Sequence, residues 1–450
     1  MTSDEEWFRL RELSVRITKG TTPTKGEGFV AQGVNYIKSE SITSSGLIDT
    51  SKFAFIDSET HEKLARSKLR AGNVLFSMAG VYLGKTAVVL PEHLPANTNQ
   101  AVGIITLDES KADSYFIHYS LQSPVCRDWV LRSAAQSAQP NFNLQEIGDL
   151  RVPALSLERQ REIASVLRSL DDRIDLLRQT NITLESIAQA LFKSWFIDFD
   201  PVRAKAEGRV PEALDAATAA LFPDELDDSA LGLIPKGWHI STLAEHVVTE
   251  RGLSYKGAGL CSADEGLPMH NLNSVLEGGD YKYSGIKHYV GDYKDRHIAL
   301  AGDVIVANTE QGHEHRLIGF PAIVPARYAR AIYSHHIYRV RLKPESALTT
   351  HVLYYTLMAP TVREQVIGCA NGSTVNMLKK AGLEIPQFVC PSADVARAFE
   401  EFAYPLRQQM EANIKRSEVL TALRDALLPR LISGKLRLPE AQVQLEDCPA

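Results

Sequence analysis

The sequence predicts an α+β protein in which two mixed α/β globular domains are separated by two long antiparallel helices that form a coiled coil. Three observations support this prediction. The chain repeats itself, since features of its first half return about 230 to 236 residues later. A long helical pattern without glycine or proline follows the first globular half, and its apolar seam recurs after the second half. Together these observations predict an internal pseudo-two-fold duplication.

The repeat is recognised from matching glycines, a matching apolar pattern and the same order of segments, more than from sequence identity. The segment LRAGNVLFSMAG corresponds to LAGDVIVANTEQG, which aligns Gly72 with Gly302. Near the start of each half, the dipeptide KG at 19–20 corresponds to RG at 251–252. A molecule with two similar ends suits an elongated, roughly dyadic target, and duplex DNA is the commonest target of that kind.

Each globular half combines short β-like runs with a helix. In the first half the runs VNYIKS, NVLFSM, TAVVLP and AVGIITL lie between turn-rich segments, and a helix is expected around residues 115–131. The second half repeats this pattern with DVIVAN, IGFPAIVP and IYRVRL, followed by a helix around 351–367. Both halves are therefore expected to be mixed α/β domains.

The long helix after the first half begins near Leu157 and has the seam of a coiled coil. Its apolar positions advance in steps of four and three, with Asn181 in the middle, where a buried polar residue fixes register at some cost in stability. The second helix carries the same seam with one charged interruption, Arg424. The alternative is that each helix packs only on its own domain. The residues expected to be structural in the coiled coil are Leu167, Ile174, Asn181, Leu184, Leu191, Leu406, Leu420 and Leu427.

The helices are expected to act as a spacer between the domains. About 38 residues at about 1.5 Å each give a rod of roughly 57 Å, longer than one turn of duplex DNA. Pro429 should kink the second helix and Gly434 should end it. Pro, Gly and acidic residues around a short Ala-rich helix predict an ordered connector. The expected divisions are a first domain at 1–155, a first long helix at 156–200, a connector at 201–234, a second domain at 235–390, a second long helix at 391–438 and a tail at 439–450.

Composition narrows the class of protein. Five cysteines without a C-x-x-C pair indicate neither a disulfide framework nor a zinc site, and they favour a reducing cytoplasm. The acidic N-terminus lacks an apolar signal region, and no run of about 18 apolar residues occurs, so no membrane association is expected. The net charge of −6 argues against a protein whose whole surface grips nucleic acid. Local basic patches, or partners that share the phosphate contacts, would still permit DNA binding.

Two patterns suggest nucleotide or metal chemistry. The segment AGVYLGKT at 79–86 resembles a relaxed phosphate loop, but β-like residues broken by Pro91 and Pro95 follow it, so no helix N-terminus is expected to hold phosphate. The second half contains many histidines, including His335 and His336, without the spacing of a metal site. Histidines in loops also suit hydrogen bonds to base edges. We therefore expect no catalytic residue and no metal site in this chain.

Two segments resemble a known family. LFKSWFIDFDPVRAKAEGR, continued by TAALFPDELDDSALGLIPKGW, is similar to the central conserved region of specificity (S) subunits of type I restriction–modification systems. ALRDALLPRLISGKLRL is similar to the distal conserved region of the same family, and the duplicated arrangement matches it over nearly the whole chain. The resemblance implies that each globular half is a target recognition domain that reads one half of a split DNA sequence.

The resemblance also implies partners and the place of the chemistry. The expected partners are double-stranded DNA, two methyltransferase (M) subunits docked on the helices and two restriction/motor (R) subunits, in the cytoplasm and away from membranes. The M subunits would hold S-adenosylmethionine and the R subunits ATP and Mg²⁺, so this chain would bind no cofactor and would not be an enzyme. Two alternatives stay open, a P-loop-like ATPase and an orphan scaffold whose domains have lost their DNA target.

The resemblance does not transfer base contacts, because the recognition domains are the variable part of the family. DNA-binding candidates are instead chosen among polar and basic residues in loops and after strands, which can bond base edges or phosphates. In the first domain they are Lys19, Thr21, Thr22, Lys25, Ser77, Lys85, Asn99 and Gln100. In the second domain they are Arg251, Ser254, Tyr255, Lys256, Asn308, Thr309, Gln311, His313 and Arg316.

Overall fold

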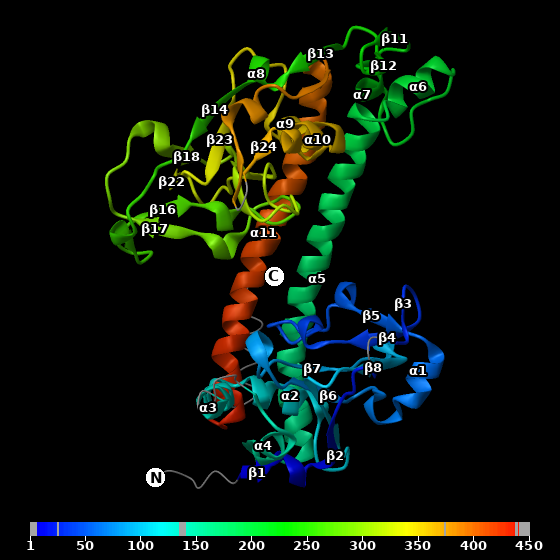
Figure 1. Ribbon diagram of the computed structural model, residues 1–450, viewed down its shortest axis with the longest axis vertical. Coiled ribbons are helices and arrows are strands. Elements are labelled where there is room, and N and C mark those ends of the chain that lie inside the picture. Colours follow the sequence, from blue (N-terminus) through cyan, green and yellow to red (C-terminus); the bar gives the residue numbers. More distant parts are fainter. Residues whose placement is uncertain (1–6, 25–26, 135–140, 373–374, 437–439, 441–450) are drawn as a thin grey trace. The chain divides into compact units, whose positions relative to one another are not determined.

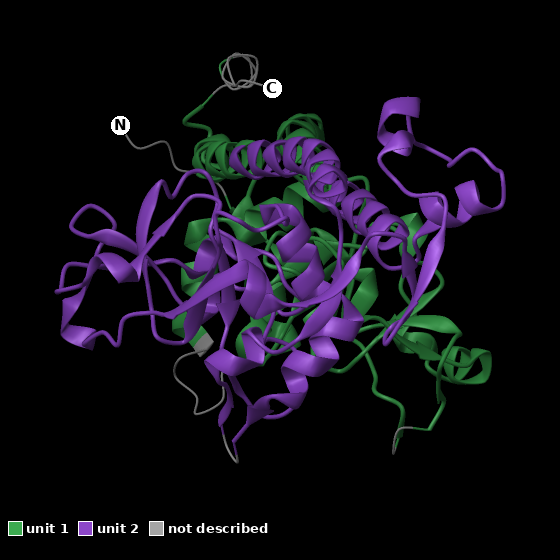
Figure 2. Ribbon diagram, turned by 90° about the horizontal axis from the view of Figure 1, so that it is seen from above, with its two compact units in different colours: residues 1–177, 416–450 green, residues 178–415 purple. Residues whose placement is uncertain are grey.

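The computed structural model describes residues 7–24, 27–134, 141–372, 375–436 and 440, and the chain divides into two compact units (Figure 2). Unit 1 comprises residues 1–177 and 416–450, and unit 2 comprises residues 178–415. Both boundaries fall inside long helices, α5 (Leu157–Phe196) and α11 (Ala393–Ile432). Each unit therefore contains one half of α5 and one half of α11.

Unit 1 combines two four-stranded sheets with helices (Figure 1). The sheet orders are β2-β9-β6-β7 and β3-β5-β4-β8, and β1 pairs with β10 separately. The strands are β1 (Trp7–Arg9), β2 (Ser14–Lys19), β3 (Phe29–Val30), β4 (Val34–Ile37), β5 (Ala54–Ile56), β6 (Val74–Ser77), β7 (Thr86–Val88), β8 (Ala96–Thr98), β9 (Val102–Leu107) and β10 (Arg151–Pro153). The helices besides α5 and α11 are α1 (Ser58–Lys63), α2 (Ser114–Gln122), α3 (Pro124–Ala134) and α4 (Leu144–Asp149).

Unit 2 contains larger sheets with the orders β14-β23-β19-β21 and β15-β17-β16-β22-β18, and smaller ones with the orders β13-β26, β20-β25-β24 and β11-β12. The strands are β11 (Leu226–Ser229), β12 (Gly232–Pro235), β13 (His239–Thr242), β14 (Val247–Arg251), β15 (Leu260–Cys261), β16 (Leu267–His270), β17 (Lys287–Tyr289), β18 (Ile298–Leu300), β19 (Val304–Ala307), β20 (Thr309–Gln311), β21 (Pro321–Ile323), β22 (Arg330–Tyr333), β23 (Ile337–Leu342), β24 (Ala370–Asn371), β25 (Val375–Leu378) and β26 (Gln387–Cys390). The helices are α6 (Asp200–Ala206), α7 (Ala216–Ala220), α8 (Leu243–His246), α9 (Thr350–Met358) and α10 (Pro360–Gly368).

The two units follow the same plan, which confirms the predicted duplication. The order β2-β9-β6-β7 corresponds to β14-β23-β19-β21, and the parallel pair β4–β8 corresponds to the parallel pair β16–β22. Gly72 and Gly302 both have positive φ, 81° and 84°, which glycine adopts without steric cost. Each also donates its N–H to a backbone carbonyl at 2.9 Å, that of Val89 or Val324. The sequence alignment and the strand registers therefore agree.

The two long helices pack against each other in antiparallel fashion. In unit 1 the first half of α5, with Leu167 and Ile174, shares a buried cluster with Leu420 and Leu427 from the second half of α11. In unit 2 the second half of α5 shares a cluster with the first half of α11, and Leu191 and Leu406 are partly buried against it. Leu184 is half-buried, and Asn181 is bonded to α11. The antiparallel coiled coil of the predicted fold is therefore present.

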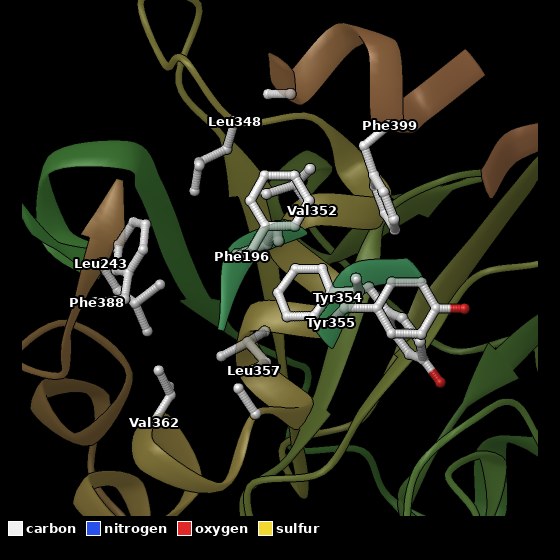
Figure 3. Close-up of a cluster of buried hydrophobic side chains, with 14 of the residues drawn as sticks. Phe196, Leu243, Leu348, Val352, Tyr354, Tyr355, Leu357, Val362, Phe388 and Phe399 are labelled. Atoms are coloured by element: carbon white, nitrogen blue, oxygen red, sulfur yellow. The ribbon is translucent and has the colours of Figure 1, made fainter. Parts of the chain in front are cut away.

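Aromatic packing fixes the helices to the globular part of unit 2 (Figure 3). Phe196 of α5 and Phe399 of α11 have ring centroids 5.3 Å apart in an edge-on arrangement. Tyr355 of α9 approaches Phe399 at 5.9 Å, also edge-on. Buried aromatic pairs of this geometry contribute about 0.5–1.5 kcal/mol beyond the area that they bury. The globular domain is thus anchored to both helices through one cluster.

We expected one helix around 115–131 and one around 351–367. This expectation is wrong in one respect, because each region forms two helices. The breaks come at Ser123 before Pro124 and at Ala359 before Pro360. A proline disfavours helical geometry in the residue that precedes it, but it is well accommodated in the first turn of a new helix. The same break at equivalent places in both units is a further sign of duplication.

The second long helix ends as expected but passes through its prolines. The chain stays helical from Ala393 to Ile432, through both Pro405 and Pro429. Leu427, Leu428 and Leu431 are buried around Pro429, and this packing holds the helix on both sides of the missing N–H donor. Gly434 follows the end with a φ of 67°, which is the usual glycine termination.

Candidate functional site

The first-domain candidates gather at one end of the sheet β2-β9-β6-β7. Lys19 is the last residue of β2 and Ser77 the last residue of β6, whereas β9 begins at Val102 and β7 at Thr86. Because neighbouring strands are antiparallel, these strand ends lie at the same end of the sheet. We call this end the sheet-end cluster of unit 1, and its members are Lys19, Thr21, Thr22, Lys85, Asn99 and Gln100.

A glycine allows the two loops of this cluster to touch. The N–H of Gly20 donates to Val102 O at 3.0 Å, and the N–H of Thr21 donates to Thr98 O at 3.0 Å. A Cβ atom on Gly20 would lie 2.2 Å from the carbonyl oxygens of both Thr98 and Asn99. That distance is far below van der Waals contact, so no other residue fits without moving the backbone.

The side chains of the unit 1 cluster differ in what they offer to a ligand. Lys19, Thr22 and Gln100 are exposed. The amide oxygen of Asn99 accepts from the N–H of Ala101 at 3.2 Å and so shapes its own turn. The ammonium of Lys85 lies 4.9 Å from the ring centre of Tyr82. Lysine and amide groups at one sheet end can meet phosphates and base edges together.

Two of the first-domain candidates stand apart. Ser77 is 0% exposed, because the residue that ends β6 points into the protein, so its hydroxyl is not presented to a ligand. Lys25 lies outside the described residues.

Unit 2 repeats the arrangement with Arg251 at the position of Lys19. Arg251 is the last residue of β14 and pairs with Tyr338, as Lys19 pairs with Gly103. A Cβ atom on Gly252 would lie 2.3 Å from Ser334 O and 2.4 Å from Tyr333 O. The same close approach of two loops is therefore built twice, with a cation at the same strand end each time.

In unit 2 the cluster is organised around His335 and His336. The carbonyl of His335 accepts from Arg251 Nε at 3.2 Å and from Asn308 Nδ2 at 3.0 Å. Thr309 Oγ1 and His336 Nδ1 are hydrogen-bonded at 3.1 Å, and the two imidazole rings lie 3.9 Å apart. Asn308 and Thr309 are only 1% and 4% exposed. They hold in place the turn that contains His335 and His336, here called the histidine turn, and they do not face solvent themselves.

Tyr255 and Lys287 complete the sheet-end cluster of unit 2, whose members are Arg251, Tyr255, Lys287, His335 and His336. Lys287 Nζ donates to Tyr255 Oη at 3.3 Å, and the rings of Tyr255 and His335 have centroids 6.3 Å apart. Sequence reasoning considered the loop histidines suited to base edges but did not include His335 and His336 among the candidates, and it missed Lys287. The repeat alignment contained the signal for His335, because this residue occupies the position of Gln100 in unit 1.

The remaining second-domain candidates lie in flanking loops. Ser254 and Lys256 are exposed after β14, and Gln311 and His313 are exposed at and beyond the end of β20. Arg316 Nε pairs with Glu314 Oε2 at 2.8 Å. Contact with DNA stays a prediction for each of these residues.

Burial sets the protonation of the histidine turn. It lowers the pKa of His336, and the positive charges of His335, Arg251 and Lys287 lower it further. His336 is therefore neutral near pH 7, and Nε2, the ring nitrogen that Thr309 does not engage, suits a hydrogen bond to an uncharged base edge.

The segment at 79–86 does not have the geometry of a phosphate loop, so the structure gives the ATPase alternative no support. Gly80–Tyr82 form a single 3-10 turn, and the residues after Lys85 enter strand β7 and not a helix. Thr86 is fully buried, where its hydroxyl bonds to His118 Nδ1 at 2.9 Å and accepts from Gln122 Nε2 at 2.7 Å. Because Lys85 leads into β7, this loop does not open a helix whose N-terminus would hold a nucleotide phosphate.

Two searches of the described residues bear on other classes of site. In that part of the chain, no three histidine, cysteine, aspartate or glutamate residues converge as the ligands of a metal ion would. Nor does any helix there combine the length and apolarity that a bilayer crossing requires.

Comparison with known proteins shows what the chain is similar to. Residues 3–186 match the family model of the type I restriction modification DNA specificity domain. This part of the chain is therefore similar to that specificity domain. A Methanocaldococcus jannaschii protein named type I restriction enzyme MjaIX specificity subunit is 25% identical over 348 residues, which cover 77% of this chain and 74% of that protein. The HindI specificity subunit of Haemophilus influenzae is 25% identical over 344 residues, covering 66% and 71%.

A solved structure supports the fold. The S subunit of a type I restriction–modification system from M. genitalium superimposes with a TM-score of 0.55 and 14% identity, covering 96% of this chain and 97% of that one. At this identity the likeness concerns the fold alone, and it covers nearly the whole chain.

Proposed function

We propose that this chain is the DNA sequence-recognition subunit of a type I restriction–modification complex, and that each unit reads one half of a bipartite DNA site. One observation carries the proposal. The same sheet end is built twice, with Lys19 and Arg251 at equivalent strand ends beside a glycine contact. Two similar readers in one chain suit a target that consists of two separated base sequences.

The proposal extends to partners and location. The paired helices α5 and α11 would dock two M subunits, and two R subunits would complete the assembly in the cytoplasm. S-adenosylmethionine would be held by the M subunits, and ATP and Mg²⁺ by the R subunits, so this chain would contribute no catalytic residue. The names of the relatives support the role, because they are specificity subunits of restriction enzymes.

Methylation mapping tests the proposal. The full chain is combined with its M partner and exposed to a library of random duplexes, and the methylated sequences are read. We expect one bipartite motif with a spacer of fixed length. Methylation without any sequence preference would contradict the proposal and would favour a scaffold that has lost its target.

Substitutions in the two sheet-end clusters show which unit reads which half of the DNA motif. Gln100→Ala should relax base preference in one half only, and His335→Ala in the other half only, because each side chain lies in the cluster of one unit. Arg209→Gln, an exposed connector residue paired with Glu207, serves as the control and should leave both halves unchanged. A relaxation of both halves by either single substitution would count against two independent readers.

A further inference from the structure

A basic groove on unit 1 is not used by the site described above. It encloses about 770 Å³ beside β2 and β9, and its cations are Arg16 of β2 and Arg66, Lys68 and Arg70 from the segment before β6. His61 of α1 also lines it. No aspartate or glutamate belongs to the described residues that line the groove. Four permanent charges therefore face one hollow without a carboxylate in its wall.

Most of these charges are not neutralised within the described part of the chain. Arg16, Arg66 and Arg70 are exposed and form no ion pair with any described residue. Lys68 is the exception, since its Nζ lies 2.6 Å from Glu62 Oε2. Arginines left without a carboxylate at the rim of a groove are typical of a phosphate-binding surface.

The groove adjoins the sheet-end cluster of unit 1. Arg66 Nη2 donates to the hydroxyl of Thr21 at 3.4 Å. Thr21 in turn accepts on its carbonyl from Tyr36 Oη at 2.9 Å, so the loop is held between the groove and the sheets. The Arg66–Thr21 contact therefore joins the groove to the cluster.

Unit 2 lacks this groove charge at the equivalent positions. The strand registers and the aligned glycines place Val248 at the position of Arg16, Ile298 at that of Lys68 and Leu300 at that of Arg70. Of these positions, only that of Arg66 has a cation in unit 2, which is Arg296. The duplication therefore conserved the fold of this face but not its charge, which marks the groove as a property of unit 1.

Two of the arginines that unit 2 carries on this face, Arg341 and Arg339, are used internally. Arg341 forms a two-pronged ion pair with Asp303, with Nε–Oδ1 at 2.8 Å and Nη2–Oδ2 at 2.5 Å. Arg339 pairs with Glu250. The residues of unit 1 equivalent to Asp303 and Arg341 are Asn73 and Thr106, which share one neutral hydrogen bond at 3.1 Å.

We propose that the groove of unit 1 binds the phosphodiester backbone of the DNA and supplies a sequence-independent grip that unit 2 does not duplicate. The inference rests on the proposed function, since it names the part of the duplex that this surface contacts. Neutralisation of phosphates by arginines releases condensed counterions, so affinity falls steeply with salt. A local grip of this kind also reconciles DNA binding with a net charge of −6.

The test measures binding as a function of salt with the full chain and its M partner. Arg16→Gln combined with Arg70→Gln should weaken binding to a matched duplex and to a scrambled duplex by the same factor. The slope of log affinity against log salt should fall by about 1.8, or about 0.9 for each phosphate that an arginine no longer neutralises. The ratio of the two affinities should stay unchanged, because phosphate contacts carry no base information.

Two further variants control for charge and folding. Arg132→Gln with Arg209→Gln removes the same charge from exposed positions that are paired with Asp128 and Glu207, and it should keep the wild-type slope. Arg16→Lys with Arg70→Lys should restore the slope. Each variant should keep the unfolding midpoint of the wild type, because Arg16 and Arg70 are exposed.

The outcomes separate the groove from the proposed function. A Gln variant with the slope of the control would overturn the groove proposal, and so would a weakening confined to the matched duplex. If the wild type bound the matched and the scrambled duplex equally well, sequence recognition would be contradicted. The change in the slope of log affinity against log salt would still test the groove. Both results are readable in one titration series.

Discussion

Asn413 of α11 donates from Nδ2 to the Oδ1 of Asn181 in α5 at 2.8 Å, in the middle of the helix pair. Asn181 Nδ2 in turn donates to the carbonyl of Met410 at 3.1 Å, and Gln409 Nε2 donates to Asn413 Oδ1 at 2.9 Å. Asn413 is only 2% exposed. A polar pair at one level of an apolar seam is satisfied in one alignment of the helices only, so it fixes their register.

Removing one member of this pair should destabilise the protein. Asn413→Ala leaves the amide oxygen of the half-buried Asn181 without its partner, which costs at most about 1–3 kcal/mol. Asn181→Leu with Asn413→Leu should recover much of that stability while weakening the choice of register. Urea unfolding measures both, with exposed Lys415→Ala as the control. An unchanged midpoint for Asn413→Ala would show that the pair has no energetic role.

Arg424 should prove essential although it interrupts the apolar seam. Its Nη1 donates to Asp171 Oδ1 at 2.7 Å, and Tyr119 Oη donates to Asp171 Oδ2 at 2.6 Å. The side chains of Arg424 and Asp171 are each 16% exposed, so Arg424→Met leaves a largely buried carboxylate with one partner fewer. We expect a destabilisation of about 2–4 kcal/mol, somewhat below the full cost for a completely buried pair.

The measurement for Arg424 is thermal or urea unfolding of the full chain. Arg430→Met is the matched control, because it lies on the same helix and is exposed. Adding Asp171→Asn to Arg424→Met should return part of the missing stability, since the amide carries no charge. Equal effects of the Arg424 and Arg430 substitutions would refute a structural ion pair.

Stability should fall as the pH drops from about 6.5 towards 4. Burial, with a smaller contribution from Arg424, lowers the pKa of His118 from 6.5 to about 4, and burial lowers that of His270 equally. Between these values the unfolded chain binds the proton and the folded chain does not, so stability rises with pH. Each histidine therefore contributes up to about 3 kcal/mol, fully present above pH 6.5.

Urea midpoints at pH 7.5, 6 and 5 test this dependence. His118→Gln and His270→Gln should each flatten it, whereas the exposed His313→Gln should not. The range stops at pH 5 because carboxylates titrate below it. A wild-type midpoint that does not change between pH 7.5 and 5 would contradict neutral burial of both histidines.

The sequence predicted the architecture but only part of the candidate site. Periodicity placed Asn181 in the seam, and the repeat placed Lys19 and Arg251 at corresponding positions, which it assigned to equivalent loops. Periodicity could not show that Ser77 and Asn308 point inward, because a one-residue change of register moves a strand residue to the other face. The direction of such a side chain depends on tertiary pairing.

Two other features depended on residues far apart in the chain. Arg424 looked like a defect in the seam because its partner Asp171 lies 253 residues away. The groove of unit 1 combines Arg16 with the segment around Arg70, and these meet only when β2 and β9 pair. Sequence distance hides ion pairs and grooves of this kind, whereas it preserves periodic patterns.

Gly20 and Gly252 should be required separately, each for the half of the DNA site that its unit reads. A Cβ atom at either position meets backbone carbonyls at 2.2–2.4 Å, which no side-chain rotation relieves. Gly20→Ala should therefore displace the loop that carries Thr21 at a cost of about 1–3 kcal/mol, as overpacking does elsewhere. Methylation of targets altered in one half should show base preference lost in that half alone, and Gly252→Ala should affect the other half. Gly257→Ala is the control, because a Cβ atom there meets nothing within 4 Å. If Gly20→Ala and Gly252→Ala both left base preference intact, the close contact of the two loops would not be what positions the readers.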